Sequence, residues 1–225
     1  MATTKGEFIE LKAEDGHRFS AYRAEPPAKV RAGVVVVQEI FGVNRHIRAV
    51  CDDFASEGYR AIAPALFDRL ERSVELDYDE PGVARGRELR TSLGWNAPLM
   101  DVAAVAEALR FAGKVGVVGY CWGGSVAWLS ATRLDVDCAL GYYGGQIVLF
   151  KDEHPNCPVM LHFGELDSMI TPEDVAQIRS AQPGVTLYTY PAGHGFNCTD
   201  RRDYHPESAQ LARTRTLEFF RAHLA

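Results

Sequence analysis

Residues 115 to 132, VGVVGYCWGGSVAWLSAT, form a run of 18 positions without a charged side chain. On length alone such a run is compatible with a membrane-spanning helix. It contains four glycines, two serines and a threonine, and a β-branched first half gives way to a helix-like second half. We therefore interpret the run as a buried strand, a tight turn and a buried helix.

Strand-like and helix-like segments alternate along the rest of the chain. The segment 30–40, VRAGVVVVQEI, contains a continuous apolar run, which suits a central strand covered on both faces. The alternation predicts an α/β fold with a mostly parallel central sheet and helices on both faces, in a single domain spanning 1–225. We expect strands at 8–13, 18–26, 30–40, 60–67, 114–120, 138–144, 158–164 and 185–192, and helices near 47–55, 102–109, 122–132, 172–180 and 207–223. The first two strands should form a hairpin around Asp15-Gly16. The charged stretch 68–81 should be a loop over one edge of the fold.

Composition narrows the classes of partner. The net charge is -6, from 24 basic and 30 acidic residues, which argues against nucleic acid or an anionic membrane as partner. The first residues lack the apolar core of a secretory signal, so we expect a cytoplasmic protein. Five cysteines without CxxC spacing favour free thiols over disulfides. Zinc binding through His154 and Cys157 would need two further ligands, and none is placed to help, so no metal is expected.

Cys121 lies in the pattern G-x-C-x-G-G, where the predicted strand 114–120 meets the predicted helix. A nucleophile on such a turn has a strained backbone, projects above the sheet, and needs glycines nearby for close packing. The N–H of Trp122, at a helix N-terminus, would then supply half of an oxyanion hole. The alternative is a buried structural cysteine, since free cysteines are often buried.

A thiol needs a base or a helix dipole to become reactive at neutral pH. His194, in TYPAGHGF, follows a predicted strand and can reach over the carboxyl edge of the sheet, although a surface-loop histidine is the alternative. Asp167 follows the preceding strand and could orient that imidazole or simply cap a turn. The order Cys121, Asp167, His194 is the nucleophile, acid, base order of α/β-hydrolases.

The segments QEIFGVN (38–44), VGYCWGG (118–124), GYYG (141–144) and PAGHGF (191–196) resemble those of the dienelactone hydrolase family, in order and with similar spacing over nearly the whole chain. The resemblance implies an α/β-hydrolase fold and a catalytic triad of Cys121, Asp167 and His194. It adds Glu39, a carboxylate beside the thiol that keeps it protonated at rest and releases it when substrate displaces the carboxylate. Ile40 would supply the second oxyanion N–H, from the loop after an early strand. The resemblance implies no cofactor, a small lactone or ester as substrate, and a monomer.

Binding of a substrate carboxylate is the least determined part of the site. The family uses arginines for it, because guanidinium offers a bidentate fork. Arg85 is expected to be one of them, with Arg87 two residues away as the alternative. The second family arginine should follow the histidine by four residues, where this chain has Cys198; Arg201 and Arg202 follow shortly.

Aromatic residues near the predicted site complete the candidates. Tyr143 is the candidate substrate-binding aromatic, and Trp122 or Tyr142 could share an aromatic pocket with it. The alternative is core packing, which is the more frequent role of aromatics in strands.

Three functions are compatible with these residues. The first is dienelactone hydrolysis, as in carboxymethylenebutenolidases, through a Cys-His-Asp triad and a thioester intermediate. The second is a broader carboxylesterase or thioesterase activity of the same fold. The third is a non-catalytic thiol sensor of oxidants at Cys121, against which the presence of Asp167 and His194 argues.

Overall fold

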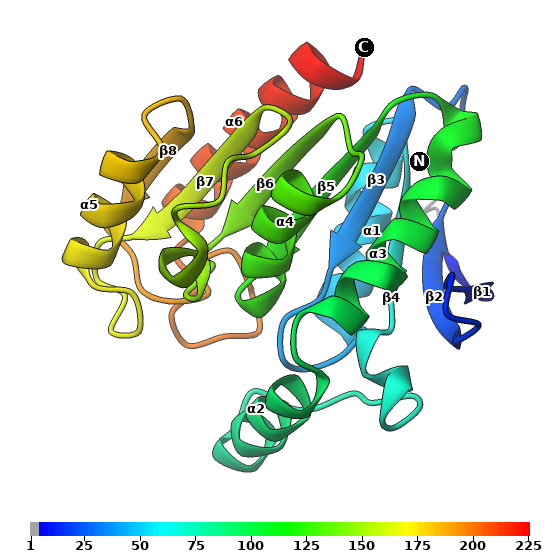
Figure 1. Ribbon diagram of the computed structural model, residues 1–225, viewed down its shortest axis with the longest axis horizontal. Coiled ribbons are helices and arrows are strands. Elements are labelled where there is room, and N and C mark those ends of the chain that lie inside the picture. Colours follow the sequence, from blue (N-terminus) through cyan, green and yellow to red (C-terminus); the bar gives the residue numbers. More distant parts are fainter. Residues whose placement is uncertain (1–4) are drawn as a thin grey trace.

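The computed structural model describes residues 5–225, in which eight strands form one sheet in the order β1-β2-β4-β3-β5-β6-β7-β8 (Figure 1). The pairs β1–β2 and β2–β4 are antiparallel, and the other neighbours are parallel. The strands are β1 (Glu7–Lys12), β2 (Arg18–Ala24), β3 (Ala32–Val37), β4 (Tyr59–Pro64), β5 (Val115–Tyr120), β6 (Cys138–Tyr142), β7 (Val159–Gly164) and β8 (Thr186–Tyr190). The prediction of a mostly parallel central sheet is confirmed.

Helices cover both faces of this sheet, as predicted. In Figure 1, α3 and α4 lie in front of the strands, while α1 and α6 lie behind them. The five helices that the sequence indicated are α1 (Arg45–Ser56), α3 (Asn96–Leu109), α4 (Trp122–Arg133), α5 (Pro172–Ala181) and α6 (Pro206–Leu224). The two central strands β3 and β5 are buried at every residue, because helices pack on both of their faces.

The uncharged run 115–132 forms β5, the turn at Cys121 and most of α4. All of these residues except Thr132 are buried in the protein core, which explains the absence of charge without a membrane. No helix within residues 5–225 combines the length and the apolar character that a membrane span requires.

The stretch 68–81 is only partly the loop that we expected. Its ends belong to a short 3-10 helix (Leu66–Arg69) and to a further helix, α2 (Glu80–Leu93), with irregular chain between them. Helix α2 has no strong apolar periodicity, and it starts because the Asp79 side chain accepts a hydrogen bond from the N–H of Gly82. It lies beyond the carboxyl ends of the strands, at the bottom of Figure 1. A Cβ atom on Gly86 would come within 2.1 Å of the Ile40 carbonyl oxygen, so α2 packs directly on the chain that leaves β3.

Candidate active site

Cys121 occupies the sharp turn between β5 and α4, with φ of 54° and ψ of -118°. A positive φ is unfavourable for a residue with a Cβ atom, so the surroundings must enforce it. Glycines permit the close packing of this turn: a Cβ on Gly119 would lie 1.8 Å from the Gly123 carbonyl oxygen, and one on Gly123 would lie 2.4 Å from the Val37 carbonyl oxygen. The predicted strand, strained turn and helix are therefore present at Cys121.

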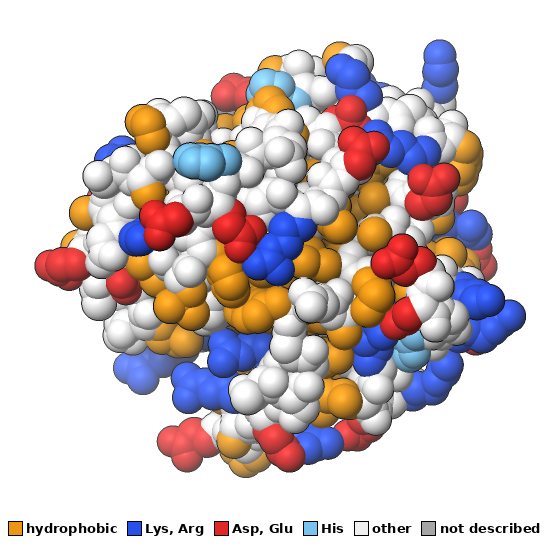
Figure 2. Space-filling model, in the orientation of Figure 1, with side chains coloured by type: hydrophobic (Ala, Val, Ile, Leu, Met, Phe, Trp, Pro, Cys, Tyr) orange, Lys and Arg blue, Asp and Glu red, His pale blue; other side chains and the backbone are white. Residues whose placement is uncertain are grey.

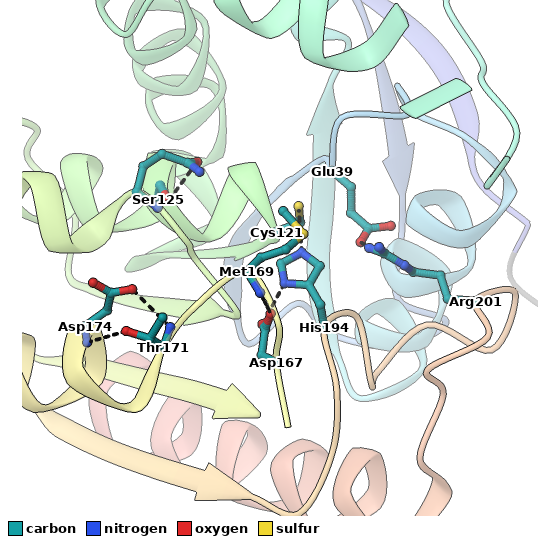
Figure 3. Close-up of polar contacts among 10 residues, drawn as sticks. Glu39, Cys121, Ser125, Asp167, Met169, Thr171, Asp174, His194 and Arg201 are labelled. Atoms are coloured by element: carbon teal, nitrogen blue, oxygen red, sulfur yellow. Dashed lines mark hydrogen bonds and ion pairs between the residues drawn. The ribbon is translucent and has the colours of Figure 1, made fainter. Parts of the chain in front are cut away.

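The side chains of Cys121, His194 and Asp167 form a continuous hydrogen-bonded chain (Figure 3). The Nε2 atom of His194 is 3.1 Å from the Cys121 sulfur, and its Nδ1 atom is 2.7 Å from Oδ2 of Asp167. The other carboxylate oxygen of Asp167 accepts a hydrogen bond from the N–H of Met169, at 2.8 Å. Asp167 follows β7 and His194 follows β8, so both approach Cys121 from the carboxyl edge of the sheet.

This arrangement changes the proton affinity of the imidazole. Burial by itself lowers the pKa of His194, but the Cys121 sulfur and the Asp167 carboxylate outweigh it and raise that pKa to about 10. The imidazole is therefore held in its protonated form at neutral pH when the sulfur is negatively charged. Asp167 also selects the tautomer, because its oxygen accepts the Nδ1 proton and leaves Nε2 for the sulfur.

Two backbone N–H groups are the predicted oxyanion donors: Trp122 follows Cys121, and Ile40 follows β3, the strand that pairs with β5. Trp122 is the first residue of α4, so its N–H has no acceptor within the helix. The carbonyl of Glu39 accepts a hydrogen bond from Nε2 of Gln38, at 3.2 Å. The N–H of Ile40 belongs to the same trans peptide as that carbonyl and points the opposite way. The hydrogen bond from Gln38 therefore does not occupy this N–H. The role of Trp122 and Ile40 as oxyanion donors stays a prediction.

Glu39 is fully buried, and two side chains bind its carboxylate. The hydroxyl of Tyr78 donates to Oε2 at 2.9 Å, and Nη1 of Arg201 donates to Oε1 at 3.0 Å. Asn44 in turn donates to the Tyr78 oxygen at 3.0 Å. The resemblance led us to expect Glu39 as the thiol's partner, whereas here the thiol contacts His194 and Glu39 forms an ion pair with Arg201 (Figure 3).

Arg201 takes the place next to Glu39 although it comes seven residues after His194. The position four residues after His194 is Cys198, which is buried and lies in a turn of the same loop. The side chain of Arg201 passes over Gly195, where a Cβ atom would lie 2.6 Å from the arginine Cδ. Arg201 was one of the alternatives in the sequence, but Tyr78 was not recognised, because it lies in irregular chain with no motif around it.

The other arginines have different surroundings. Arg85 is half-buried on α2, and its guanidinium forms ion pairs with Glu71 and Glu88. Arg87 and Arg202 are exposed. Substrate binding through Arg85 would require its release from both carboxylates, and that role stays a prediction.

Tyr143 and Trp122 are both buried beside the triad. The ring of Tyr143 is 5.2 Å from the ring of His194, centre to centre, and its backbone has a φ of 40°. Its hydroxyl has no hydrogen-bond partner among residues 5–225. The indole of Trp122 stacks on Phe67. Trp122 therefore packs in the core, and substrate binding by Tyr143 stays a prediction.

Comparison with known proteins places this site in context. A sequence profile described as the dienelactone hydrolase family matches residues 19–224. The chain is 34% identical to a carboxymethylenebutenolidase of Pseudomonas putida, with 95% of each chain covered, and 32% identical to carboxymethylenebutenolidase 1 of Cupriavidus pinatubonensis, with 93% and 94% covered. A crystal structure from Klebsiella pneumoniae, described as a candidate dienelactone hydrolase, superposes with a TM-score of 0.86 at 31% identity, over 96% of this chain and 97% of that one.

Proposed function

This chain belongs to the dienelactone hydrolase family and is a carboxylic ester hydrolase, and we propose on that premise that Cys121 is the nucleophile of a lactone- and ester-hydrolysing reaction. The observation that carries the proposal is the hydrogen-bonded chain from the Cys121 sulfur through His194 to Asp167. A thiol, an imidazole and a carboxylate from three separate turns support the roles of nucleophile, base and orienting acid, in that order.

The first half of the reaction forms a thioester. The Cys121 thiolate attacks the carbonyl carbon, and the carbonyl oxygen becomes an oxyanion that accepts hydrogen bonds from the N–H groups of Trp122 and Ile40. Each such donor stabilises the transition state by about 3–4 kcal/mol. The carbon–oxygen bond of the ester or lactone then breaks, and Nε2 of protonated His194 gives its proton to the leaving oxygen.

The second half restores the thiolate. Neutral His194, oriented by Asp167, takes a proton from water, and the hydroxide formed attacks the thioester carbon. The carbon–sulfur bond breaks, the acid leaves, and His194 keeps the proton opposite the regenerated thiolate. The sum is one ester bond and one water converted to one acid and one hydroxyl group.

Glu39 is linked to the reacting sulfur through Arg201, because both the Glu39 carboxylate and the Cys121 sulfur raise the pKa of that guanidinium. In this structure Arg201 and Tyr78 hold its carboxylate, while His194 holds the thiol. This arrangement supports a state in which the Cys121 thiol has left Glu39 and contacts its base, His194. Glu39 and Arg201 then set the charge around the bound substrate.

The relatives named carboxymethylenebutenolidases suggest a lactone bearing a free carboxylate as substrate. The second candidate is a broader carboxylesterase, and specific observations favour it. Cys198 replaces the arginine expected four residues after His194, Arg201 is already paired with Glu39, and Arg85 is paired with Glu71 and Glu88. Arg85 and Arg201 are therefore both engaged by carboxylates, whereas Arg87 and Arg202 are exposed.

The experiment compares a dienelactone with an uncharged aryl ester, using the native chain, Cys121→Ala and, as a matched control, Cys157→Ala. We expect both activities to disappear in Cys121→Ala and to persist in the control, since Cys157 lies far along the chain in partly exposed surroundings. Equal turnover by native chain and Cys121→Ala would exclude the cysteine nucleophile. A preference for the aryl ester would favour the broader esterase over the lactonase.

A further inference from the structure

A cluster of three potential metal ligands includes the buried carboxylate of Glu39. Glu39, His46 and Cys198 are all buried, and each offers one ligand atom such that the three atoms lie within 4.8 Å of one another. They come from three separate segments: the chain after β3, the first turn of α1 and the loop after β8. The hydrolytic mechanism uses neither His46 nor Cys198.

His46 is the member of the cluster that the fold leaves without a partner. Its side chain is more than nine-tenths buried, yet its Nε2 atom has no hydrogen-bond partner among residues 5–225. A buried polar atom without a partner costs about 1–3 kcal/mol, so such atoms are rare unless something else satisfies them. A metal ion bound through Nε2 would satisfy it.

The ligand set identifies the class of ion. One thiolate, one imidazole and one carboxylate form the mixed soft and hard set that Zn²⁺ binds, whereas Mg²⁺ and Ca²⁺ prefer oxygen ligands alone. In a tetrahedral zinc site with these ligands, the ligand atoms lie about 3.4–3.6 Å apart. The three ligand atoms now lie within 4.8 Å of one another, so they would have to approach by up to about 1.4 Å to reach that geometry.

Charge around the cluster is also compatible with a divalent cation. A Glu39 carboxylate and a Cys198 thiolate supply two negative charges to the ion, although Glu39 also balances the guanidinium of Arg201. Burial, aided by Glu39 and Asp200, raises the pKa of the Cys198 thiol to about 11, so metal binding must displace the thiol proton. Burial lowers the pKa of His46, which leaves its imidazole neutral. Arg201 binds Oε1 of Glu39, and the Tyr78 hydroxyl binds Oε2 and also interacts with the Cys198 side chain, so an ion could reach Oε2 and the sulfur only after this hydroxyl moves.

An acidic cavity lies next to sequence neighbours of the cluster, although none of the three ligands lines it. It has a volume of about 440 Å³ and includes Tyr78, whose hydroxyl bonds Glu39, and Asp200, which lies two residues after Cys198. Its remaining lining is Asn44, Arg45, Glu75, Leu76, Asp77 and Asp79. Four carboxylates against one guanidinium attract cations to this opening.

We infer that Glu39, His46 and Cys198 form a binding site for one thiophilic divalent cation, with Zn²⁺ the best match. The fourth position is left for water, because these three side chains are the ligands that the cluster provides. This inference concerns metal binding and stands whether or not Cys121 is the nucleophile.

The test uses the full chain, reduced and freed of metal, titrated with Co²⁺ in place of Zn²⁺. Cobalt bound to a thiolate gives a charge-transfer absorption in the near ultraviolet, and native mass spectrometry with Zn²⁺ gives the stoichiometry. We expect one ion per chain and the thiolate band in the native protein. Cys198→Ser should remove the band, and His46→Gln should weaken Zn²⁺ binding at least tenfold, the lower limit for losing even a supporting contact.

Two matched variants separate this site from other thiols. Cys121→Ser tests binding at the triad, which also contains a thiol, an imidazole and a carboxylate, and Cys157→Ser tests a thiol with no such neighbours. Both should keep the band. A native protein that binds no ion, or a band that survives Cys198→Ser and disappears in Cys121→Ser, would overturn the inference. The native spectrum alone decides the first point, so a variant that fails to fold does not rescue the proposal.

Discussion

The ion pair between Arg201 and Glu39 allows a quantitative test of how this site is held together. Glu39 is fully buried, and the Arg201 side chain is only 16% exposed. Arg201→Met removes the guanidinium but keeps an unbranched side chain that can still pack near Phe41 and Tyr78, whose rings lie 5.7 Å from the guanidinium carbon. Glu39 would retain only the hydrogen bond from Tyr78.

Removal of one partner from a buried ion pair costs about 3–5 kcal/mol, because the remaining charge is left uncompensated. For a chain of this size each kcal/mol lowers the melting temperature by about 2–4 °C, which predicts a decrease of about 6–20 °C. Arg45→Met is the matched control, because Arg45 pairs with Asp200 at the surface and is 80% exposed. We expect it to cost less than about 1 kcal/mol.

The double variant Glu39→Gln/Arg201→Met identifies the cause of the loss. Glutamine carries no charge, so the double variant should be more stable than Arg201→Met alone. The measurement is equilibrium urea unfolding at neutral pH, followed by tryptophan fluorescence. If Arg201→Met costs no more than Arg45→Met, or if adding Glu39→Gln restores nothing, the reasoning about an uncompensated buried charge is wrong.

Two further predictions follow from the turn that holds Cys121. Burial lowers the pKa of His194, whereas the Cys121 sulfur raises it, and the net value is about 10. Cys121→Ala should therefore shift the titration of the imidazole, followed by ¹⁵N NMR, to clearly lower pH. An unchanged midpoint would show that the sulfur does not hold the proton on the imidazole. Gly119→Ala should prevent stable folding, because its Cβ would lie 1.8 Å from the Gly123 carbonyl oxygen. The control is Gly184→Ala, whose Cβ would have no atom within 4 Å and which should change the free energy of unfolding by less than about 1 kcal/mol. Similar urea midpoints for the two variants would contradict the close packing of the turn.

The sheet and the meeting of Cys121, Asp167 and His194 could be predicted from the sequence because both depend on short-range patterns. Continuous apolar runs such as Val34–Val37 identify buried strands, and glycines around Cys121 identify a turn too tight for other residues. Parallel strands bring their carboxyl ends to one edge, so residues that follow strands meet there. Asp167 and His194 could therefore be assigned without knowing the fold in detail.

The surroundings of Glu39 could not be predicted in the same way. Tyr78 and Arg201 come from irregular segments, and their contacts with Glu39 join residues 39 and 162 positions apart. No periodicity or spacing records such contacts, since they depend on the path of two loops. Helix α2 was missed for a related reason: within it, only Gly82, Gly86 and Leu89 are buried, too few to give a clear apolar pattern.

The loop between β8 and α6 supplies both His194, which binds the carboxylate of Asp167, and Arg201, which binds the carboxylate of Glu39. Detachment of this one segment would leave the carboxylates of Asp167 and Glu39 without their cationic partners. It would also remove His194 from the Cys121 sulfur. The protein should therefore have no half-assembled form with partial turnover. Its inactivation by heat or protease at this loop should follow a single step, well before the sheet beneath it is lost.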